Sequence, residues 1–153
     1  IPFIIAGEGQ RYDNRATAVQ PVPVNHVDIA PTTLGLCGIG KPAWMEGYDY
    51  SSYRLTDRSR PAGEPDSAYI QSVIPTGHGH SINKPWRGIV TRDGWKYAAF
   101  ENQSWLLFNL NEDPYETANH AHNNRYRGER KKLNARLNQW IHDTGDKFPL
   151  PED

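Results

Sequence analysis

The sequence predicts an α+β protein, in which a strand and a helix from the end of a larger α/β domain precede a small antiparallel sheet packed by a C-terminal helix. Three observations support this fold class. An apolar run opens the chain and a helix pattern follows it, three β-rich runs with tight turns come later, and an amphipathic helix pattern lies near the end. Strand followed by helix is typical of layered α/β units, whereas consecutive strands with short turns form antiparallel sheets. We therefore expect two parts, residues 1–66 and residues 67–153.

Composition limits the classes of protein to which the chain can belong. The 153 residues carry a formal net charge of −1 with 23% charged residues, which gives no electrostatic case for binding nucleic acid or an anionic membrane. No run approaches the length of a membrane span. The single cysteine, Cys37, excludes an internal disulfide bond and a multi-cysteine zinc site, and we expect it to be a small core residue.

The opening segment has the pattern of a strand that is buried on both faces. Residues 1–6 are apolar without alternation, as in a parallel sheet covered on both sides. No initiator methionine or signal-peptide pattern precedes them, so we expect the chain to be the C-terminal part of something longer.

A helix is predicted after this strand. Asp28 is expected to cap it, Pro31 falls in its first turn, and Gly38 suits the position just beyond its end. Residues 41–66 are irregular and rich in polar residues. We expect them to connect the two parts of the chain.

The second part is predicted to begin with a strand over residues 67–74, followed by a three-stranded meander over residues 86–110. Asp93-Gly94 lies between two β-rich runs, and this pair is a strong hairpin signal because both turn residues are expected to adopt positive φ. Asn102-Gln103 separates the second and third strands of the meander. Alternation places Trp105 and Leu107 on the same face of the third strand. Both faces of that strand are largely apolar, so we expect a helix to cover the sheet.

Two helix signals follow the meander. Asp113-Pro114-Tyr115-Glu116 has the pattern of a capped helix start. A longer helix is predicted from about Arg125 to Asp143, with Thr144-Gly145 ending it. Its expected apolar stripe is Tyr126, Leu133, Leu137, Trp140 and Ile141.

The loop over residues 76–85 is rich in side-chain hydrogen-bond donors. His78 and His80 can bind a metal or an anionic group, or can be exposed histidines without a ligand, and the lack of a nearby acid or cysteine disfavours a metal. Lys84 and Arg87 flank Trp86, and a cationic pair beside an aromatic ring can hold a sulfate, a carboxylate or a sugar face. The alternative is that Trp86 packs in the fold and Arg87 pairs with a local acid.

Four segments, in the same order along the chain, resemble the sulfatase family. Residues 1–7 resemble its apolar strand, and residues 25–39, with Val-Asp-Ile-Ala-Pro, resemble the helix that follows. Residues 86–97 resemble its strand pair, with Arg-Gly-Ile-Val-Thr before Lys-Tyr. Residues 107–119 resemble its Leu-Tyr-Asp-Leu segment with Asp-Pro-x-Glu. The resemblance covers nearly the whole chain.

This resemblance implies the alkaline-phosphatase-like superfamily and the hydrolysis of sulfate esters on small molecules or glycans. In that family a formylglycine hydrate attacks sulfur beside a calcium ion, and the formylglycine forms from Cys or Ser in a C/S-x-P/A-x-R motif. Cys37 is followed by Gly-Ile-Gly-Lys, which does not match that motif. No catalytic residue or metal ligand is therefore assigned to this chain, and calcium and formylglycine are expected only in the full-length enzyme. The family also suggests a periplasmic or secreted setting.

In such enzymes the C-terminal subdomain closes one side of the substrate pocket. The loop over residues 76–87 occupies the expected place, so the resemblance suggests His78, His80, Lys84 and Arg87 as substrate-binding residues. The chain is then the C-terminal part of a sulfatase, inactive by itself and dependent on an N-terminal sulfatase domain. Two alternatives stay open. One is a non-catalytic module that binds sulfated or acidic glycans, and the other is the end of a related phosphoesterase, against which the Asp-Pro-x-Glu segment argues.

Overall fold

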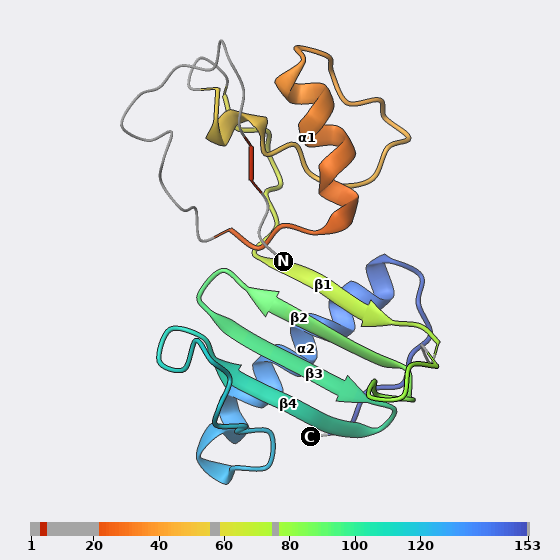
Figure 1. The fold of residues 1–153 in the computed structure, drawn as a ribbon, viewed down its shortest axis with the longest axis vertical. Coiled ribbons are helices and arrows are strands. Elements are labelled where there is room, and N and C mark those ends of the chain that lie inside the picture. Colours follow the sequence, from red (N-terminus) through yellow and green to blue (C-terminus); the bar gives the residue numbers. More distant parts are fainter. Residues whose placement is uncertain (1–3, 6–21, 56–58, 75–76, 153) are drawn as a thin grey trace. The chain divides into compact units, whose positions relative to one another are not determined.

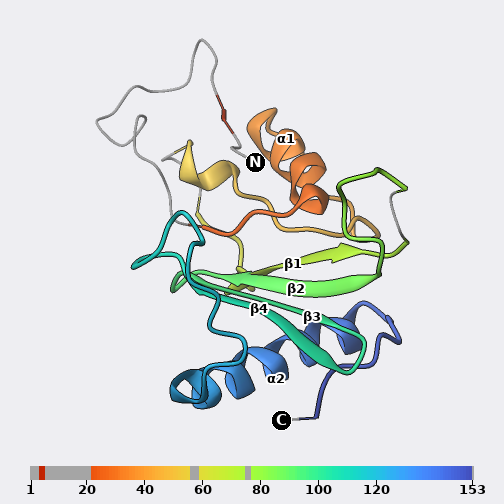
Figure 2. The same ribbon diagram turned by 60° about the horizontal axis from the view of Figure 1, so that its bottom comes forward.

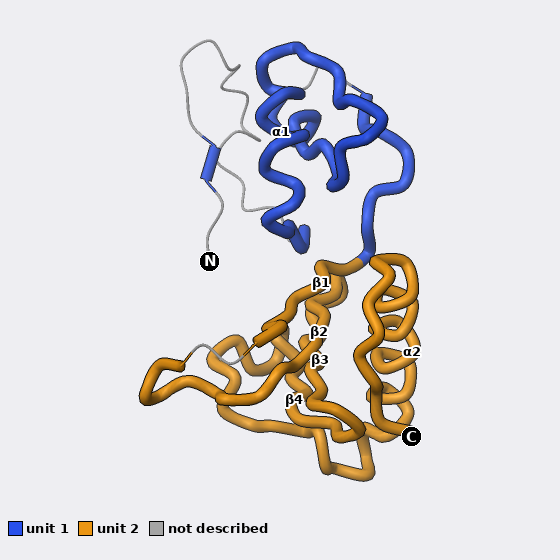
Figure 3. Tube along the Cα trace, turned by 90° about the vertical axis from the view of Figure 1, so that its right-hand side faces the viewer, with its two compact units in different colours: residues 1–66 blue, residues 67–153 orange. Residues whose placement is uncertain are grey.

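The structure, a computed structural model, describes residues 4–5, 22–55, 59–74 and 77–152. The chain divides into two compact units, Ile1–Asp66 and Ser67–Asp153 (Figure 3). The strand predicted over residues 1–6 lies outside the described residues except for Ile4 and Ile5. Among the described helices, none is long and apolar enough to cross a membrane.

The first unit is built around one short α-helix. Its elements are η1 (His26–Asp28), α1 (Ile29–Leu36) and η2 (Ser51–Tyr53). Asp28 occupies the N-cap position of α1 as predicted, but its side chain makes no capping hydrogen bond there. A 3₁₀ turn precedes α1, and Asn25 caps that turn in a capping box. The carboxylate of Asp28 instead accepts from the backbone amides of Asn25 and Tyr48, both at 2.7 Å. Asp28 thereby ties the helix start to the chain that follows the helix.

The C-terminal end of α1 follows the prediction. Gly38 adopts a φ of 81°, and the amide of Ile39 donates to the carbonyl of Leu34 at 2.9 Å, as in a Schellman motif. The prediction that Cys37 is a core residue is wrong, since its side chain is exposed. The helix buries the opposite side, formed by Pro31, Thr32 and Gly35.

The second unit is a four-stranded antiparallel sheet with helix α2 against one face (Figures 1 and 2). Its strands are adjacent in chain order: β1 (Ser67–Ser72), β2 (Trp86–Thr91), β3 (Trp95–Phe100) and β4 (Gln103–Asn109). The 3₁₀ turn η3 (Asn124–Tyr126) leads into α2 (Arg127–Asp143). The predicted α+β fold, with its antiparallel sheet and packed C-terminal helix, is confirmed.

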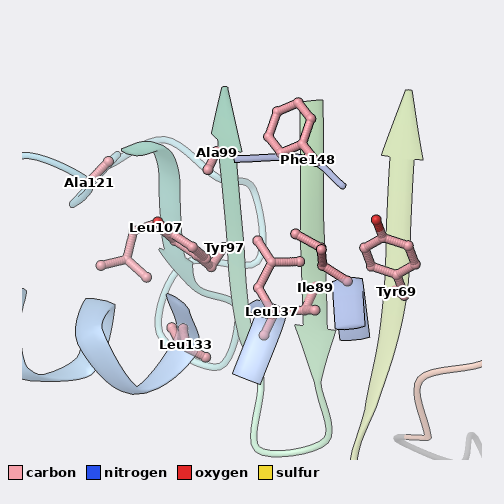
Figure 4. Close-up of a cluster of buried hydrophobic side chains, with 10 residues drawn as sticks. Tyr69, Ile89, Tyr97, Ala99, Leu107, Ala121, Leu133, Leu137 and Phe148 are labelled. Atoms are coloured by element: carbon pink, nitrogen blue, oxygen red, sulfur yellow. The ribbon is translucent and has the colours of Figure 1, made fainter. Parts of the chain in front are cut away.

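Alternate residues of the strands face α2 and form the core (Figure 4). Ile89, Tyr97 and Leu107 retain no exposed surface, and neither does Leu137 from the helix. The predicted apolar stripe of the helix is confirmed, with Tyr126 and Trp140 packed at its margins. The buried members of the core are Tyr69, Ile89, Tyr97, Ala99, Leu107, Ala121, Leu133, Leu137, Ile141 and Phe148.

Two short turns join the last three strands. Residues 92–94 connect β2 to β3, and Gly94 alone among them has a positive φ, 88°. The prediction of positive φ at both Asp93 and Gly94 is therefore wrong, because three residues, and not two, form the connection. The amide of Trp95 donates to the Thr91 hydroxyl at 3.0 Å and closes this turn. In the turn between β3 and β4, Asn102 has a φ of 55°.

The predicted helix start at Asp113 is also wrong. Its carboxylate accepts from the Ala118 amide at 2.8 Å and the Thr117 hydroxyl at 3.0 Å, and these bonds, led by the one from Ala118, lower the pKa of Asp113. Glu116 adopts a φ of 55°, which a helix does not allow. Its carboxylate pairs with Lys96 at 2.7 Å. Asp113 therefore caps a turn, and the first α-helix after the sheet is α2.

Candidate substrate-binding site

The β1–β2 loop, residues 73–85, carries three of the four predicted site residues. His78, His80 and Lys84 are all exposed. Within the loop, the backbone amide and the hydroxyl of Ser81 donate to the carbonyl of His78 at 3.0 and 2.9 Å. The loop therefore presents two imidazoles and one ammonium group to solvent. Ile82 contributes an exposed apolar side chain beside them.

An aromatic cluster of Trp86, Phe100 and Trp105 adjoins the end of this loop. The Phe100 and Trp105 rings stack with centroids 4.4 Å apart, and Trp86 lies 5.9 Å from Trp105. The Lys84 ammonium lies 5.6 Å from the centre of the Phe100 ring, within the range of a cation–π interaction. The loop cation is thus held beside apolar ring surface.

The position of Trp105 depends on an irregularity in the sheet. Ala98 pairs with Leu106 whereas Ala99 pairs with Ser104, so Trp105 is the extra residue of a β-bulge. The prediction that Trp105 and Leu107 share one face of the strand is therefore wrong. The bulge turns Trp105 away from the core and toward Trp86 and Phe100. Sequence alternation alone contained no signal for this change.

Arg87, the fourth predicted site residue, has a different environment. It is 5% exposed, and its Nε lies 2.5 Å from the Asp146 carboxylate. Its Nη1 donates to the carbonyls of Ser72 at 3.0 Å and Trp86 at 3.1 Å. The guanidinium also lies 4.6 Å from the centre of the Phe148 ring. This geometry matches the alternative in which the arginine pairs with an acid, although the acid lies 59 residues away.

Hydrogen bonding around Asp146 changes two pKa values. The bond from Arg87 is the largest cause that lowers the pKa of Asp146, to about 2. Tyr69 donates its hydroxyl proton to the same carboxylate at 2.9 Å, and burial is the main cause that raises the pKa of Tyr69. The carboxylate is therefore ionised and the phenol neutral at neutral pH. Sequence reasoning missed Asp146, since nothing near Gly145 in the sequence indicates its partner on β2.

The exposed groups of the loop and the neighbouring cluster are hydrogen-bond donors and aromatic rings. An ammonium group and two imidazoles can donate hydrogen bonds to sulfate or carboxylate oxygens, and aromatic rings can contact a sugar face. Across the described ranges, no group of three or more His, Cys, Asp or Glu residues could hold a metal ion. The described residues therefore do not fit a calcium site, and we derive no catalytic step from them.

Comparisons with known proteins show which class of protein this chain resembles. A curated relative, the ulvan-active sulfatase of Formosa agariphila, is 30% identical over 148 residues, which cover 97% of this chain and 28% of the relative. The solved structure of BT4656 in complex with its substrate D-glucosamine-2-N,6-O-disulfate has a TM-score of 0.64 and 27% identity, and it covers 80% of this chain and 24% of that one. The first of these two proteins is a sulfatase, and this chain resembles a part of it.

The family can be stated more narrowly. The family N-sulphoglucosamine sulphohydrolase, C-terminal, matches residues 9–143, and this chain belongs to it. The phosphonate monoester hydrolase of Agrobacterium radiobacter shares the fold, with a TM-score of 0.57 and 21% identity over 76% of this chain and 24% of its own. The fold is thus shared by hydrolases of different esters. The chain spans only about a quarter of the length of these relatives.

Proposed function

We propose that this chain is the C-terminal part of a sulfatase that acts on sulfated carbohydrate, and that its β1–β2 loop lines one side of the substrate pocket. His78, His80 and Lys84 contact anionic groups of the substrate in this proposal. The nucleophile and the calcium ligands come from an N-terminal sulfatase domain outside this chain. The family membership and the similarity to the ulvan-active sulfatase support the enzyme class, and the likeness to BT4656, whose substrate carries sulfate groups, agrees with it.

One observation carries the binding role. The loop joins the Lys84 ammonium to a cluster of three aromatic rings, with Lys84 5.6 Å from the centre of Phe100. A cation beside ring surface matches a sulfated sugar, which has anionic oxygens next to an apolar ring face. The likeness to BT4656, whose substrate is a disulfated glucosamine, agrees with this class of ligand.

Helix α1 supports the proposal that a longer chain completes the fold. Val27, Ile29 and Ile39, at its two ends, all have exposed side chains. A helix that is apolar on most of its sides is normally buried. We propose that the N-terminal sulfatase domain covers this surface.

The binding role can be tested with the chain alone. Isothermal titration calorimetry with D-glucosamine-2-N,6-O-disulfate is expected to show binding that weakens about tenfold in Lys84→Ala and in His80→Ala, which corresponds to the loss of one charge-assisted contact. His122→Ala is the matched control, because His122 is exposed but lies outside the loop. Equal affinities for all variants, or no binding at all, would overturn the assignment of these contacts.

The enzymatic part of the proposal has a separate test. The chain alone is expected to show no calcium-dependent hydrolysis of an aryl sulfate, whereas addition of the N-terminal domain of a related sulfatase restores it. Calcium-dependent turnover by these 153 residues alone would contradict the proposal. Saccharide binding that persists while no added domain restores turnover would favour the non-catalytic glycan-binding module.

A further inference from the structure

We propose that Arg87 is a positioning residue that fixes both ends of the β1–β2 loop, and that it acts on substrate only through the loop residues. The inference rests on the proposed function, because it assigns a role to the loop in binding. The sequence suggested that Arg87 contacts the substrate, but in this inference it does not. Instead, it fixes the positions of His78, His80 and Lys84.

The guanidinium bonds lie at the two points where the loop leaves the sheet. Ser72 is the last residue of β1 and Trp86 is the first residue of β2, and these two residues are paired in the ladder. Arg87 Nη1 donates to the carbonyls of both, at 3.0 and 3.1 Å. One side chain therefore joins the backbone on either side of the loop.

The guanidinium is itself held by residues beyond α2. Asp146 accepts from its Nε at 2.5 Å, and the ring of Phe148 lies 4.6 Å from its central carbon. Tyr69 donates to the same Asp146 oxygen and so adds a third fixed group. The side chain of Arg87 is only 6% exposed, and two other segments, β1 and residues 146–148, therefore determine its orientation.

Two side-chain hydrogen bonds among the described residues in and beside the loop are local. Ser81 bonds to His78 three residues earlier, and the Ser72 hydroxyl bonds to Ile74 two residues later. Bonds of this span shape a turn but do not connect the loop's ends. Lys84 lies two residues before Trp86, so its position depends directly on the backbone that Arg87 holds.

Arg87→Lys is the sharpest variant for this proposal. Lysine keeps the positive charge beside Asp146 but has a single nitrogen, whereas arginine bonds Asp146 through Nε and both carbonyls through Nη1. Hydrogen–deuterium exchange of the whole chain is expected to show amides of residues 77–84, among them the Ser81 amide that donates to His78, exchanging about tenfold faster, with β3 and β4 unchanged. Lys84→Ala is expected to leave this exchange at the wild-type rate.

A control variant separates positioning from general loss of stability. Leu133→Ala removes core volume on the opposite side of the core from Tyr69 (Figure 4). It is expected to lower the melting temperature without a selective increase in loop exchange. If Arg87→Lys fails to fold, Asp146→Asn replaces it, since asparagine keeps the shape and removes the charge that orients the guanidinium.

Saccharide binding distinguishes this inference from the proposed function. Arg87→Lys is expected to weaken the binding of the disulfated glucosamine about tenfold, as Lys84→Ala does. Only Arg87→Lys is expected to change the hydrogen exchange of the loop amides. Unchanged loop exchange in folded Arg87→Lys or Asp146→Asn would overturn the positioning role. If neither His80→Ala nor Lys84→Ala affects binding while loop exchange still responds to Arg87→Lys, the proposed function fails and the structural role of Arg87 stands.

Discussion

The three connections of the sheet differ in how they are specified. The β2–β3 and β3–β4 turns take two or three residues each, and each has a residue with positive φ, Gly94 and Asn102. The β1–β2 loop takes thirteen residues and exposes its imidazoles and its ammonium group. The short turns are determined by their own residues, whereas the long loop is held at its base by Arg87 and Asp146.

Under the proposed function, this difference separates the residues that stabilise the sheet from the residues that bind substrate. The turns set the register of strands whose side chains fill the core, so their geometry is part of the fold. Exposed loop residues away from the base contribute little to folding, and they are free to contact a ligand. Substitutions in the two kinds of connection should therefore differ in what they change.

The largest effect is expected from the core that both kinds of connection depend on. Leu137→Ala removes a side chain with no exposed surface, between α2 and the sheet. Urea unfolding should show that the free energy of unfolding falls by about 3 kcal/mol or more, because removal of a large buried side chain leaves a cavity. A loss below about 1 kcal/mol would mean that α2 does not stabilise the sheet as described.

A matched pair of glycines tests the turn against the loop. Both Gly94 and Gly77 have positive φ, but a Cβ on Gly94 would come within 2.5 Å of Asn111, whereas a Cβ on Gly77 meets nothing within 4 Å. Gly94→Ala should lower the free energy of unfolding by about 2 kcal/mol, from backbone strain and the clash with Asn111. Gly77→Ala should lower it by about 1 kcal/mol, from backbone strain alone. Thermal unfolding measures both. Equal losses would contradict the distinction between the two connections.

The base of the loop should respond to acid. Because the pKa of Asp146 falls from 3.8 to about 2 in the folded chain, its stabilising contribution is complete above pH 3.8 and disappears as pH falls through about 2. Over that pH range we expect the free energy of unfolding to fall by roughly 1 kcal/mol, a value that allows for screening of the ion pair by solvent. Unfolding at several pH values checks it, and Asp146→Asn should flatten the dependence. An unchanged slope in that variant would rule out Asp146 as the source.

The smallest effects on stability are expected at the loop contacts. Lys84→Ala and His80→Ala should change the free energy of unfolding by less than about 0.5 kcal/mol, because both side chains are exposed. Calorimetric unfolding alongside the binding measurement tests this. A large loss of stability in either variant would show that the loop belongs to the folded core after all.

The regular elements followed from local pattern. Strand alternation and turn residues predicted the meander, and the spacing of Leu133, Leu137 and Ile141 predicted the buried stripe of α2. The predicted helix start at Asp113 failed because its carboxylate found partners at Thr117 and Ala118 instead. A capping pattern indicates which hydrogen bonds a side chain can accept, but it does not distinguish a helix start from another turn that offers the same kind of bond.

The candidate site was predictable in part. The donor content of the loop and the charge beside Trp86 drew attention to His78, His80 and Lys84, which the structure leaves exposed. The ion pair of Arg87 with Asp146 spans 59 residues, and no local pattern indicates a pair at that distance. The turn of Trp105 toward Phe100 depends on a bulge that only the pairing of two strands can show.

The location of the Arg87 bonds has a consequence for how this surface can vary. Both carbonyls that Arg87 holds lie on strand residues, and the acid that orients it lies beyond α2. These hydrogen bonds at the base of the loop therefore do not depend on the identity of the residues between Ser72 and Trp86. If the loop binds substrate as proposed, we expect that its exchange for a loop of another length or sequence would alter ligand preference while the sheet stays the same.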